Sequence, residues 1–394
     1  MSLLLLLAAL DGIAALSAYM FFAIPAMLHG LMYRACYLRR CDAAYAPTVS
    51  IFIPCKDTSD NLEDSVDTFL RRQYHRARLF FVVEDEQDAA YPIIRKLIKN
   101  RHDTALIVAG RTTSCGQKNH NLLQGIQAAG QKDDVYVFLD AIMTITNQQL
   151  RDLLMPLSSP HVTVATGFRW DILTRKTLGE RLHAFMLALQ WSLLSSSLVY
   201  TTWGGCTAIR REDFEEMGVA AYWQKTVVDD MTLTKLLRQQ RRTSVLVPTC
   251  IKETTSPVTT VKGAILWFRR QTLYVKFYLR SYWLFALALL ISISVNALSF
   301  PFWLAGSIVR PGRMMTLFAA VTGTFTVVIM VCCLLFKRSA ADNHGRLSWF
   351  LLSPLYLALA CWAYLLGAFT RVLHWRGIAY HLDRHGYVER VVRQ

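Results

Sequence analysis

Long apolar segments constrain the fold of this chain more than any other feature of its sequence. One covers residues 2–33, broken only by Asp11, and others lie at about 282–309, 315–336 and 349–369. An α-helix needs about 20 apolar residues to cross roughly 30 Å of hydrocarbon, and each segment meets that length. The chain is 53% hydrophobic, above ordinary soluble usage, and the excess lies in these segments. We therefore expect an integral membrane protein that spans the bilayer several times.

The first segment predicts a transmembrane anchor over residues 1–33, and the last three predict membrane helices over residues 281–370. A signal peptide is the alternative for the first. However, no basic residue precedes that segment, and it exceeds the roughly 7–15 residues of a signal-peptide core. Asn296 and Pro301 predict a kink or break in the first C-terminal helix. The apolar stretch 183–200 contains polar residues and predicts an interfacial or buried helix, with a further span as the alternative.

Basic residues predict how the protein is oriented in the membrane. Arg34, Arg39 and Arg40 follow the first apolar segment, so the positive-inside rule places residues 34–280 in the cytoplasm. Residues 371–394 form a basic tail, which would lie outside if every segment spans. The sequence leaves open whether one late segment is re-entrant or whether the rule fails at this end.

The net charge of +15 suits a protein that lies against anionic lipid headgroups, because basic residues gather beside the apolar segments. No helix-turn-helix, zinc-finger or aromatic RNA-binding pattern accompanies this charge, so we expect no nucleic-acid partner. The nine cysteines lack Cys-x-x-Cys spacing and predict neither a zinc site nor a disulfide framework.

Between the anchor and the C-terminal segments, predicted strands alternate with predicted helices. The strands are expected at 49–54, 79–83, 105–109 and 135–139, and the helices at 61–72, 91–99 and 118–129. This alternation predicts an α/β domain with a mostly parallel sheet covered on both faces. Residues 45–280 are enough for one such Rossmann-like domain, inserted between the membrane segments.

Acidic residues follow the expected strands. Glu84-Asp85-Glu86 comes after the strand at 79–83, Asp140 comes after the strand at 135–139, and Asp229-Asp230 follows two valines. Parallel strands bring the residues at their carboxyl ends to one edge of the sheet, where nucleotides bind in open α/β sheets. The sequence therefore predicts an enzyme that handles a nucleotide-linked donor beside a bilayer.

Short motifs follow one another in a recognisable order along the chain. They are Pro54-Cys-Lys-Asp57, Val82-Val-Glu-Asp-Glu-Gln-Asp88, Gly116-Gln-Lys-Asn-His-Asn-Leu122, Phe138-Leu-Asp140, Trp203-Gly-Gly-Cys-Thr-Ala208, Val227-Val-Asp-Asp230 and Trp375-Arg-Gly-Ile-Ala-Tyr380. In this order they resemble the membrane-bound inverting glycosyltransferases of the GT-A fold. The resemblance is strongest to ceramide glucosyltransferase and its bacterial lipid-glycosylating relatives, and it covers nearly the whole chain.

The resemblance implies roles for the acidic residues. Asp85, with Pro54 nearby, would contact the uracil of a UDP-sugar, while Glu84 and its other acidic neighbours are expected to be solvated loop carboxylates. Asp140 would bind Mg²⁺ or Mn²⁺, although Asp140-Ala-Ile lacks the second acid of the usual Asp-x-Asp. Asp230 would be the general base and Asp229 its partner, since adjacent carboxylates raise one another's pKa. The alternative for Asp229 is the N-cap of a helix over 231–240, which is compatible with catalysis by Asp230.

The resemblance also implies contacts for the diphosphate and the acceptor. Lys118 and the run Arg269-Arg270-Gln271 would stabilise the leaving UDP, although Arg269 equally fits the cytoplasmic end of a membrane helix. The family's usual Arg-Trp is absent from that run, which argues against a processive polymer synthase. An acceptor platform is implied for Trp203, Gly204, Gly205 and Cys206, with a tight turn and a core tryptophan as the alternative.

The function implied is the transfer of one hexose, with glucose favoured, from a UDP-sugar to a membrane lipid hydroxyl such as that of a ceramide-like acceptor. A polysaccharide synthase is one alternative. A non-catalytic membrane scaffold with a degenerate transferase domain is the other, because the Asp-x-Asp and Arg-Trp elements are both incomplete. Trp375 and Tyr380 are expected to be interfacial aromatic anchors.

Overall fold

The computed structural model describes residues 12–13, 28, 33, 38–58, 62–71, 74–195, 201–335 and 346–393. The expected anchor over 1–33 and the end of the expected helix over 183–200 thus lie largely outside the described residues. The chain divides into two compact units. The sheet unit comprises Gly30–Arg169, Ser197–Glu253 and Arg371–Gln394, and the helical unit comprises Met1–His29, Trp170–Ser196 and Thr254–Thr370.

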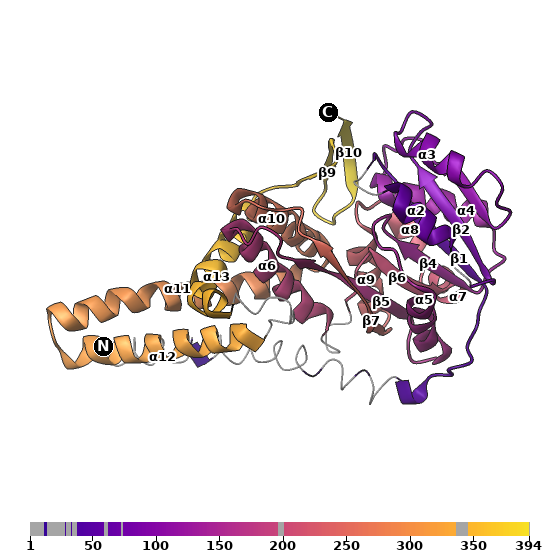
Figure 1. The fold of residues 1–394 in the computed structure, drawn as a ribbon. Helices are drawn as coiled ribbons and strands as arrows, with labels where there is room; N and C mark the ends of the chain where they lie inside the picture. The colour runs from indigo at the N-terminus through magenta and orange to yellow at the C-terminus, as the bar shows by residue number, and fades with distance from the viewer. Residues whose placement is uncertain are drawn as a thin grey trace. The chain divides into compact units, whose positions relative to one another are not determined.

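A seven-stranded sheet with the order β3-β2-β1-β4-β6-β5-β7 organises the sheet unit (Figure 1). Strand β1 pairs in parallel with β2 and β4, and β2 pairs in parallel with β3, whereas β6 runs antiparallel to β4 and β5. The expected mostly parallel sheet is confirmed. The strands are β1 Val49–Pro54, β2 Ala77–Val83, β3 Thr104–Val108, β4 Val135–Leu139, β5 Val164–Ile172, β6 Cys206–Arg210 and β7 Ser244–Thr255.

Both faces of this sheet are covered by a buried core. Successive side chains of a strand point to opposite faces, so one strand contributes to both cores. Ile51 and Ile53 of β1 belong to one core cluster, and Phe52 between them belongs to the other. This burial explains why the central strands read as continuous apolar runs. The covering helices are α2 Leu62–Leu70, α3 Ala90–Leu97, α4 Gln117–Ala129, α5 Asn147–Leu154, α7 Arg211–Glu216, α8 Val219–Trp223 and α9 Asp229–Gln239, with short 3-10 helices at Leu38–Arg40 and Met155–Ser158.

The expected basic tail is a second, three-stranded antiparallel sheet that belongs to the sheet unit. Its strands are β8 Val372–Trp375, β9 Ile378–Leu382 and β10 Val388–Arg393. The β8–β9 turn consists of Arg376 and Gly377, with φ of 45° and 73°. Positive φ at both central residues is typical of the tight turns that join two strands of a hairpin. The expectation that Tyr380 is an interfacial anchor is wrong, since this side chain is only 1% exposed inside the sheet unit.

The helical unit consists of long helices, of which α11, α12 and α13 are long and apolar enough to cross a membrane. Its helices are α6 Leu178–Leu194, α10 Val261–Tyr278, α11 Arg280–Val309, α12 Arg313–Leu335 and α13 Arg346–Ala368. Helix α11 continues through Pro301, so the expected break is not present. Helix α6 packs against α10 and α13 and buries most of its side chains, in agreement with a buried helix. Both α6 and α10, which the sequence analysis included in residues 45–280, group with α11, α12 and α13 in the helical unit.

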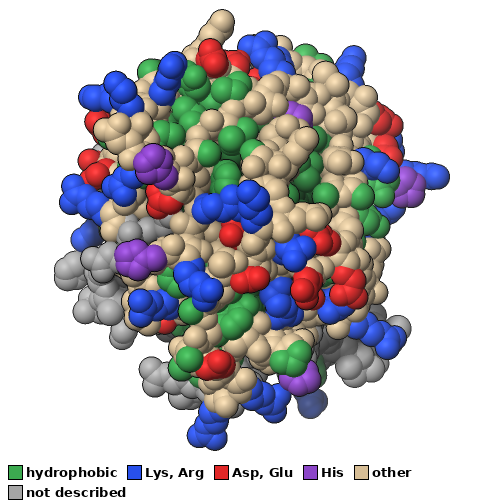
Figure 2. Space-filling view, turned by 90° about the vertical axis from the view of Figure 1, so that its right-hand side faces the viewer, with side chains coloured by type: hydrophobic (Ala, Val, Ile, Leu, Met, Phe, Trp, Pro, Cys, Tyr) green, Lys and Arg blue, Asp and Glu red, His purple; other side chains and the backbone are tan. Residues whose placement is uncertain are grey.

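Charge is mixed on the face of the molecule that Figure 2 draws. Figure 2 shows Lys and Arg side chains interspersed with Asp and Glu side chains over the face that it draws. A single extended basic surface would be expected of a protein that binds the nucleic-acid backbone.

Candidate functional site

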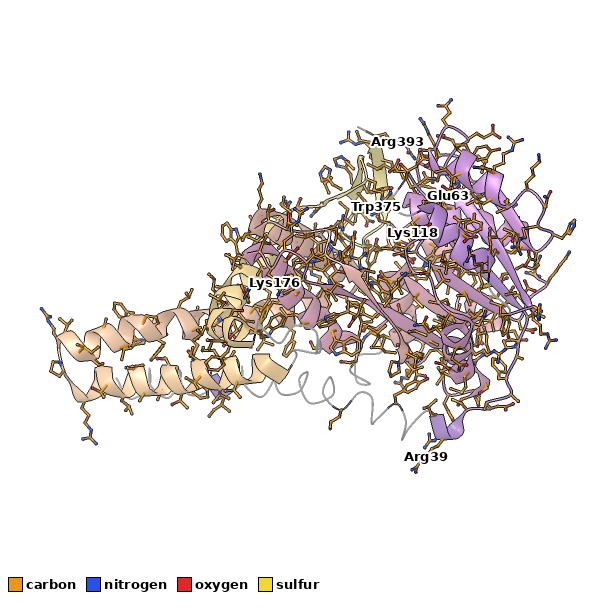
Figure 3. All side chains as sticks on the ribbon, in the orientation of Figure 1. Arg39, Glu63, Lys118, Lys176, Trp375 and Arg393 are labelled. Carbon is orange, nitrogen blue, oxygen red and sulfur yellow. The ribbon has the colours of Figure 1, made fainter. Side chains whose placement is uncertain are left out.

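A partly buried ammonium group is the centre of the candidate site. Lys118, near the start of α4 (Figure 3), places its Nζ 3.0 Å from Asp140 Oδ1 and 3.0 Å from Asp229 Oδ2. The same Nζ donates a hydrogen bond of 2.9 Å to the Gly204 carbonyl. Burial by itself lowers the pKa of Lys118, but the charges of Asp140, Asp229 and Asp230 outweigh it and raise the pKa above its ordinary value. The ammonium therefore stays charged between the acids.

The paired acids occupy the start of α9. This helix begins at Asp229 with Val228 as its N-cap, so the expected cap at Asp229 and the expected start at Met231 are both wrong. The Asp230 carboxylate accepts hydrogen bonds from the backbone N–H of Met231 at 2.6 Å and of Gly204 at 3.1 Å. Carboxylates in the first turn are favoured by the helix dipole and by the free N–H groups there.

The two carboxyl groups differ in exposure and titration. Asp229 is 5% exposed, whereas Asp230 is partly exposed. Burial, and then the charge of Asp229, raise the pKa of Asp230 to about 7. Burial also raises the pKa of Asp229, against the opposing charge of Lys118. A carboxylate with a pKa near neutrality suits a general base, because it can both accept and release a proton at that pH.

Two glycines bring the backbone against these acids. A Cβ on Gly204 would lie 2.4 Å from Asp229 Oδ2, so no side chain fits there. Besides the bonds of Gly204 to Asp230 and Lys118, the Gly205 carbonyl accepts the backbone N–H of Asp140 at 3.0 Å. The sequence suggested that these glycines let backbone approach an acceptor. In the structure they let it approach the acids, and no local sequence pattern indicates this role.

The other residues of that motif lie in the packing around the glycines. Trp203 is half-buried, its ring lies 5.8 Å from that of Phe168, and it fills the space where a Cβ on Gly205 would lie. Cys206 is fully buried in β6. Trp203 thus combines a core contact with partial exposure, while the Cys206 side chain is enclosed.

A third glycine, Gly116, allows the start of α4 to pack closely against the segment that precedes α9. A Cβ on Gly116 would lie 2.1 Å from the Val227 carbonyl oxygen. The Gly116 N–H donates to the Thr226 carbonyl at 2.9 Å, and the Asn119 amide donates to the same carbonyl at 3.0 Å. These contacts hold Lys118 beside Asp229, although the two residues are far apart in sequence.

The residues after β1 and β2 form a charged cluster at the same sheet edge. Glu84 is 6% exposed and pairs with Lys56 at 3.2 Å, with Arg111 at 3.4 Å and with Arg393. The expectation that Glu84 is a solvated loop carboxylate is therefore wrong. Asp85 is more exposed than Glu84, and its Oδ2 lies 3.4 Å from Arg111. The sequence analysis did not predict roles for Arg111 or Arg393, because their ion pairs with Glu84 join segments that are distant in sequence.

Pro54 and the run Arg269-Arg270-Gln271, which were also expected to bind the donor, belong to different compact units. Pro54 ends β1, in register with Val82 of β2, and so reaches the same edge as Asp85. Arg269, Arg270 and Gln271 lie in α10 of the helical unit.

One carboxylate is available for a divalent cation. Within the described residues no group of three or more His, Cys, Asp or Glu side chains could hold a metal ion alone. The Asp140 side chain is 36% exposed and uses Oδ1 for its ion pair with Lys118. Mg²⁺ usually takes one or two carboxylates and completes its coordination with phosphate and water. Asp140 fits that mode of binding.

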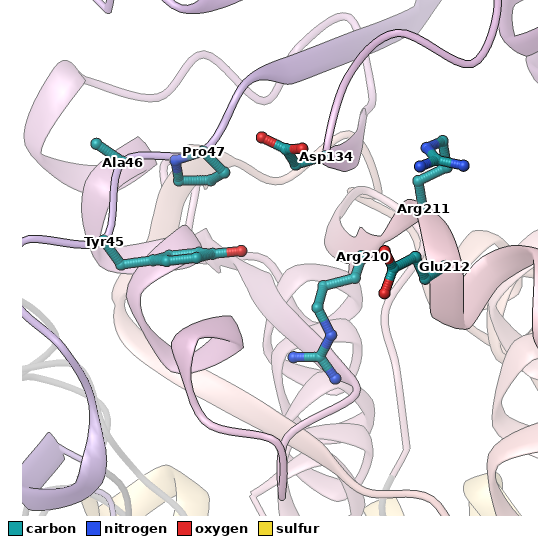
Figure 4. Close-up of a pocket in the computed structure, with 7 residues that line it drawn as sticks. All are labelled: Tyr45, Ala46, Pro47, Asp134, Arg210, Arg211 and Glu212. Atoms are coloured by element: carbon teal, nitrogen blue, oxygen red, sulfur yellow. The ribbon is translucent and has the colours of Figure 1, made fainter.

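A cavity of about 330 Å³ in the sheet unit is separate from these residues (Figure 4). Asp134, which lines it, directly precedes β4, whereas Asp140 directly follows β4. The cavity therefore lies at the opposite edge of the sheet from the candidate site. Its lining consists of Tyr45, Ala46, Pro47, Asp134, Arg210, Arg211 and Glu212, none of which was predicted to be functional.

Comparison with known proteins gives both a family and a fold. Residues 16–388 match glycosyl transferase family 21. Ceramide glucosyltransferases 1 and 3 of Caenorhabditis elegans are 29% and 28% identical over 85 residues, which are 21% of this chain and 18% of each relative. The match thus spans under a fifth of these relatives. A mannosyltransferase of Pyrobaculum calidifontis, PcManGT, has a TM-score of 0.56 at 14% identity, covering 92% of this chain and 99% of its own. This structural likeness supports the GT-A fold.

Proposed function

The chain belongs to glycosyl transferase family 21, and from this premise we propose that it transfers one hexose, with glucose favoured, from a UDP-sugar to the hydroxyl of a membrane lipid. A ceramide-like lipid is the favoured acceptor. The observation that carries the proposal is the cluster of Lys118, Asp140, Asp229 and Asp230. It brings together a cation, a carboxylate suited to a divalent metal ion, and a carboxyl group whose pKa is raised to about 7. The names of the Caenorhabditis elegans relatives support the sugar and the lipid.

Asp230 is the proposed general base. Its carboxylate takes the proton of the acceptor hydroxyl as that oxygen attacks the anomeric carbon of the donor. The bond from that carbon to the phosphate oxygen breaks, and UDP leaves with the electron pair. Because attack comes from the face opposite UDP, the configuration inverts. Asp229 holds Lys118 and raises the pKa of Asp230.

The donor is held at both ends. Asp85, with Pro54 beside it, contacts the uracil, and Lys118 stabilises the negative charge that gathers on the leaving UDP. A bound Mg²⁺ or Mn²⁺ would neutralise diphosphate charge, and Asp140 would hold it. PcManGT was solved in complex with GDP-Man and Mn²⁺, which supports a metal-assisted nucleotide sugar here. Arg269, Arg270 and Gln271 are further candidates for the diphosphate.

The acceptor reaches the site from the bilayer. Helices α11, α12 and α13 are long and apolar enough to hold the protein in a membrane. Gly204 lies against Asp230, and with Trp203 and Gly205 it remains the proposed acceptor platform. Cys206, whose side chain is fully buried, would shape this platform only through its backbone. The arginines after the first apolar segment support a cytoplasmic α/β domain, where nucleotide sugars are available.

The two alternatives are less well supported. The assembled cluster around Lys118 argues against a scaffold, because buried charges without a function are costly to retain. The absence of the family's Arg-Trp element argues against a processive polysaccharide synthase. Only the products of the reaction separate single transfer from polymerisation.

The test is UDP release by detergent-purified full-length protein in the presence of Mn²⁺. UDP-glucose, UDP-galactose and UDP-N-acetylglucosamine are each offered with ceramide and with extracted membrane lipids, and products are identified by mass spectrometry. We expect ceramide that has gained one glucose. A ladder of sugars would establish the synthase instead, and a protein that neither binds UDP nor releases it would establish the scaffold.

The metal is tested by titrating UDP-glucose binding with Mn²⁺ and with a chelator. Asp140→Ala should abolish the increase in affinity that Mn²⁺ gives, because it removes the proposed ligand. Asp64→Ala, which removes an exposed carboxylate on α2, is the matched control. An Asp140→Ala variant that keeps the full Mn²⁺ effect would remove this residue from the metal site.

A further inference from the structure

The C-terminal sheet, β8 to β10, contacts the segment that carries Lys118. The Tyr380 hydroxyl of β9 accepts the backbone N–H of Gln117, the first residue of α4, at 3.1 Å. Arg393 of β10 donates to the Gln117 side-chain oxygen at 2.7 Å. Both Tyr380 and Gln117 are buried, at 1% and 2% exposure. Tyr380 and Arg393 of the C-terminal sheet therefore both bond to Gln117, the residue that precedes Lys118.

Gln117 also forms hydrogen bonds with the loop before α4 and with the next turn of that helix. Its side-chain amide donates to the Gly110 carbonyl and to the Asn121 side-chain oxygen, both at 2.8 Å. With Arg393 and Tyr380 in place, both its backbone N–H and its side chain are engaged. A buried amide with this many partners fixes one orientation, because any other leaves polar groups unpaired.

The same sheet also contacts the segments that follow β1 and β2 and the segment before α9. Arg376, in the β8–β9 turn, donates to the Lys56 carbonyl at 2.7 Å, and Arg393 also pairs with Glu84. At its other end, the Val388 N–H donates to the Lys225 carbonyl at 2.9 Å, four residues before Asp229. The sheet thus holds the loops after β1 and β2, the start of α4 and the segment before α9 at once.

We propose that the C-terminal sheet positions Lys118 for the reaction, with Tyr380 and Arg393 acting through Gln117 as positioning residues. Lys118 is held between Asp140 and Asp229 only if the first turn of α4 stays in place. Tyr380 and Arg393 supply the hydrogen bonds that keep it there. This inference rests on the proposed function for its kinetic consequence, but the position of Lys118 is measurable without any reaction.

The variant Tyr380→Phe removes the hydrogen bond to the Gln117 N–H, and Arg393→Met removes both the bond to the Gln117 side chain and the ion pair with Glu84. Both variants leave the apolar packing. Tyr387→Phe, directly before β10, and Arg390→Met, in β10, are the matched controls. Among the described residues Tyr387 Oη makes no hydrogen bond, and the Arg390 side chain bonds only to His381. Acylation of lysines, read at the Lys118 peptide by mass spectrometry, measures the enclosure of that side chain. We expect faster labelling of Lys118 in the two test variants and wild-type labelling in the two controls.

Kinetics separate positioning from a merely structural role. Each test variant should lower kcat/KM for the donor by roughly tenfold, the size of one lost hydrogen bond in the transition state. Arg393→Lys, which keeps the charge opposite Glu84 but cannot reach both partners, should recover part of the loss. In a Lys118→Met background, neither Tyr380→Phe nor Arg393→Met should lower kcat/KM further.

The outcomes are distinguishable. Losses that add fully to that of Lys118→Met, or unchanged labelling of Lys118 in both test variants, would overturn the positioning role. A wild-type protein that neither binds UDP nor transfers sugar would refute the proposed function. In that case the labelling of Lys118 still decides whether the sheet holds this side chain in place.

Discussion

Asp230 is the residue whose replacement gives the most direct test at the scale of single side chains. Asp230→Asn keeps the shape and one acceptor oxygen for the Gly204 N–H but cannot take a proton. We expect turnover to fall about 10²–10⁴-fold, the contribution of general base catalysis, with UDP affinity nearly unchanged. Steady-state kinetics and UDP calorimetry measure the two effects, with Asp64→Asn as the control. Full turnover in the variant would exclude Asp230 as the base.

The titration of the paired acids predicts how activity depends on pH. Asp230 must be deprotonated to act as a base, and its pKa is raised to about 7. Activity should therefore rise as the pH rises through neutrality and fall away on the acid side. The apparent pKa of this limb belongs to the coupled pair rather than to one residue.

Removal of the Asp229 charge should shift the acid side of the pH–activity profile. In Asp229→Asn, the carboxylate that raises the pKa of Asp230 is gone, so half-maximal activity should shift to lower pH. The pH profile of kcat for both proteins is the measurement. A limb that stays in place would mean that burial alone sets the titration of Asp230.

The packing of α4 against the segment before α9 gives a prediction at the scale of secondary-structure elements. Gly116→Ala would place a Cβ 2.1 Å from the backbone carbonyl of Val227, which cannot move like a side chain. We expect a loss of roughly 1–3 kcal/mol in stability, as for other overpacked sites, together with a fall in kcat/KM as Lys118 and Asp229 separate. Thermal unfolding and donor kinetics measure both.

Gly312→Ala is the control for this substitution, because the nearest heavy atom to its new Cβ would lie 3.8 Å away. It adds the same methyl group without the clash. If Gly116→Ala matched this control in both stability and kinetics, the two elements would not need their close approach.

The placement of the protein in the membrane gives a prediction for the whole molecule. If the sheet unit is cytoplasmic, an exposed position on it should be shielded from an impermeant thiol reagent in intact cells. Lys132 is exposed in the loop before β4, so Lys132→Cys is a suitable reporter over the background of the native cysteines. We expect labelling of this cysteine only after the cells are permeabilised. Labelling in intact cells would reverse the orientation.

The sequence by itself determined the strands and helices whose pattern repeats over a few neighbouring residues. The residues 49–54 form the predicted strand as β1, and 135–139 form the predicted strand as β4, because continuous apolar runs are buried on both faces. The last three apolar segments form the long helices α11 to α13. The acids after the strands likewise reach the sheet edge, since strand direction alone determines where they emerge.

Only the tertiary structure decided which residues meet. Lys118 and Asp229 form an ion pair because Gly116 allows two distant backbones to touch, and no local pattern reports that contact. The buried state of Glu84 depends on Arg393, near the other end of the chain. The C-terminal sheet was missed for the same reason. From the sequence, its arginines indicate only a basic tail. The partners that they bind are far away in sequence, and only the fold brings them together.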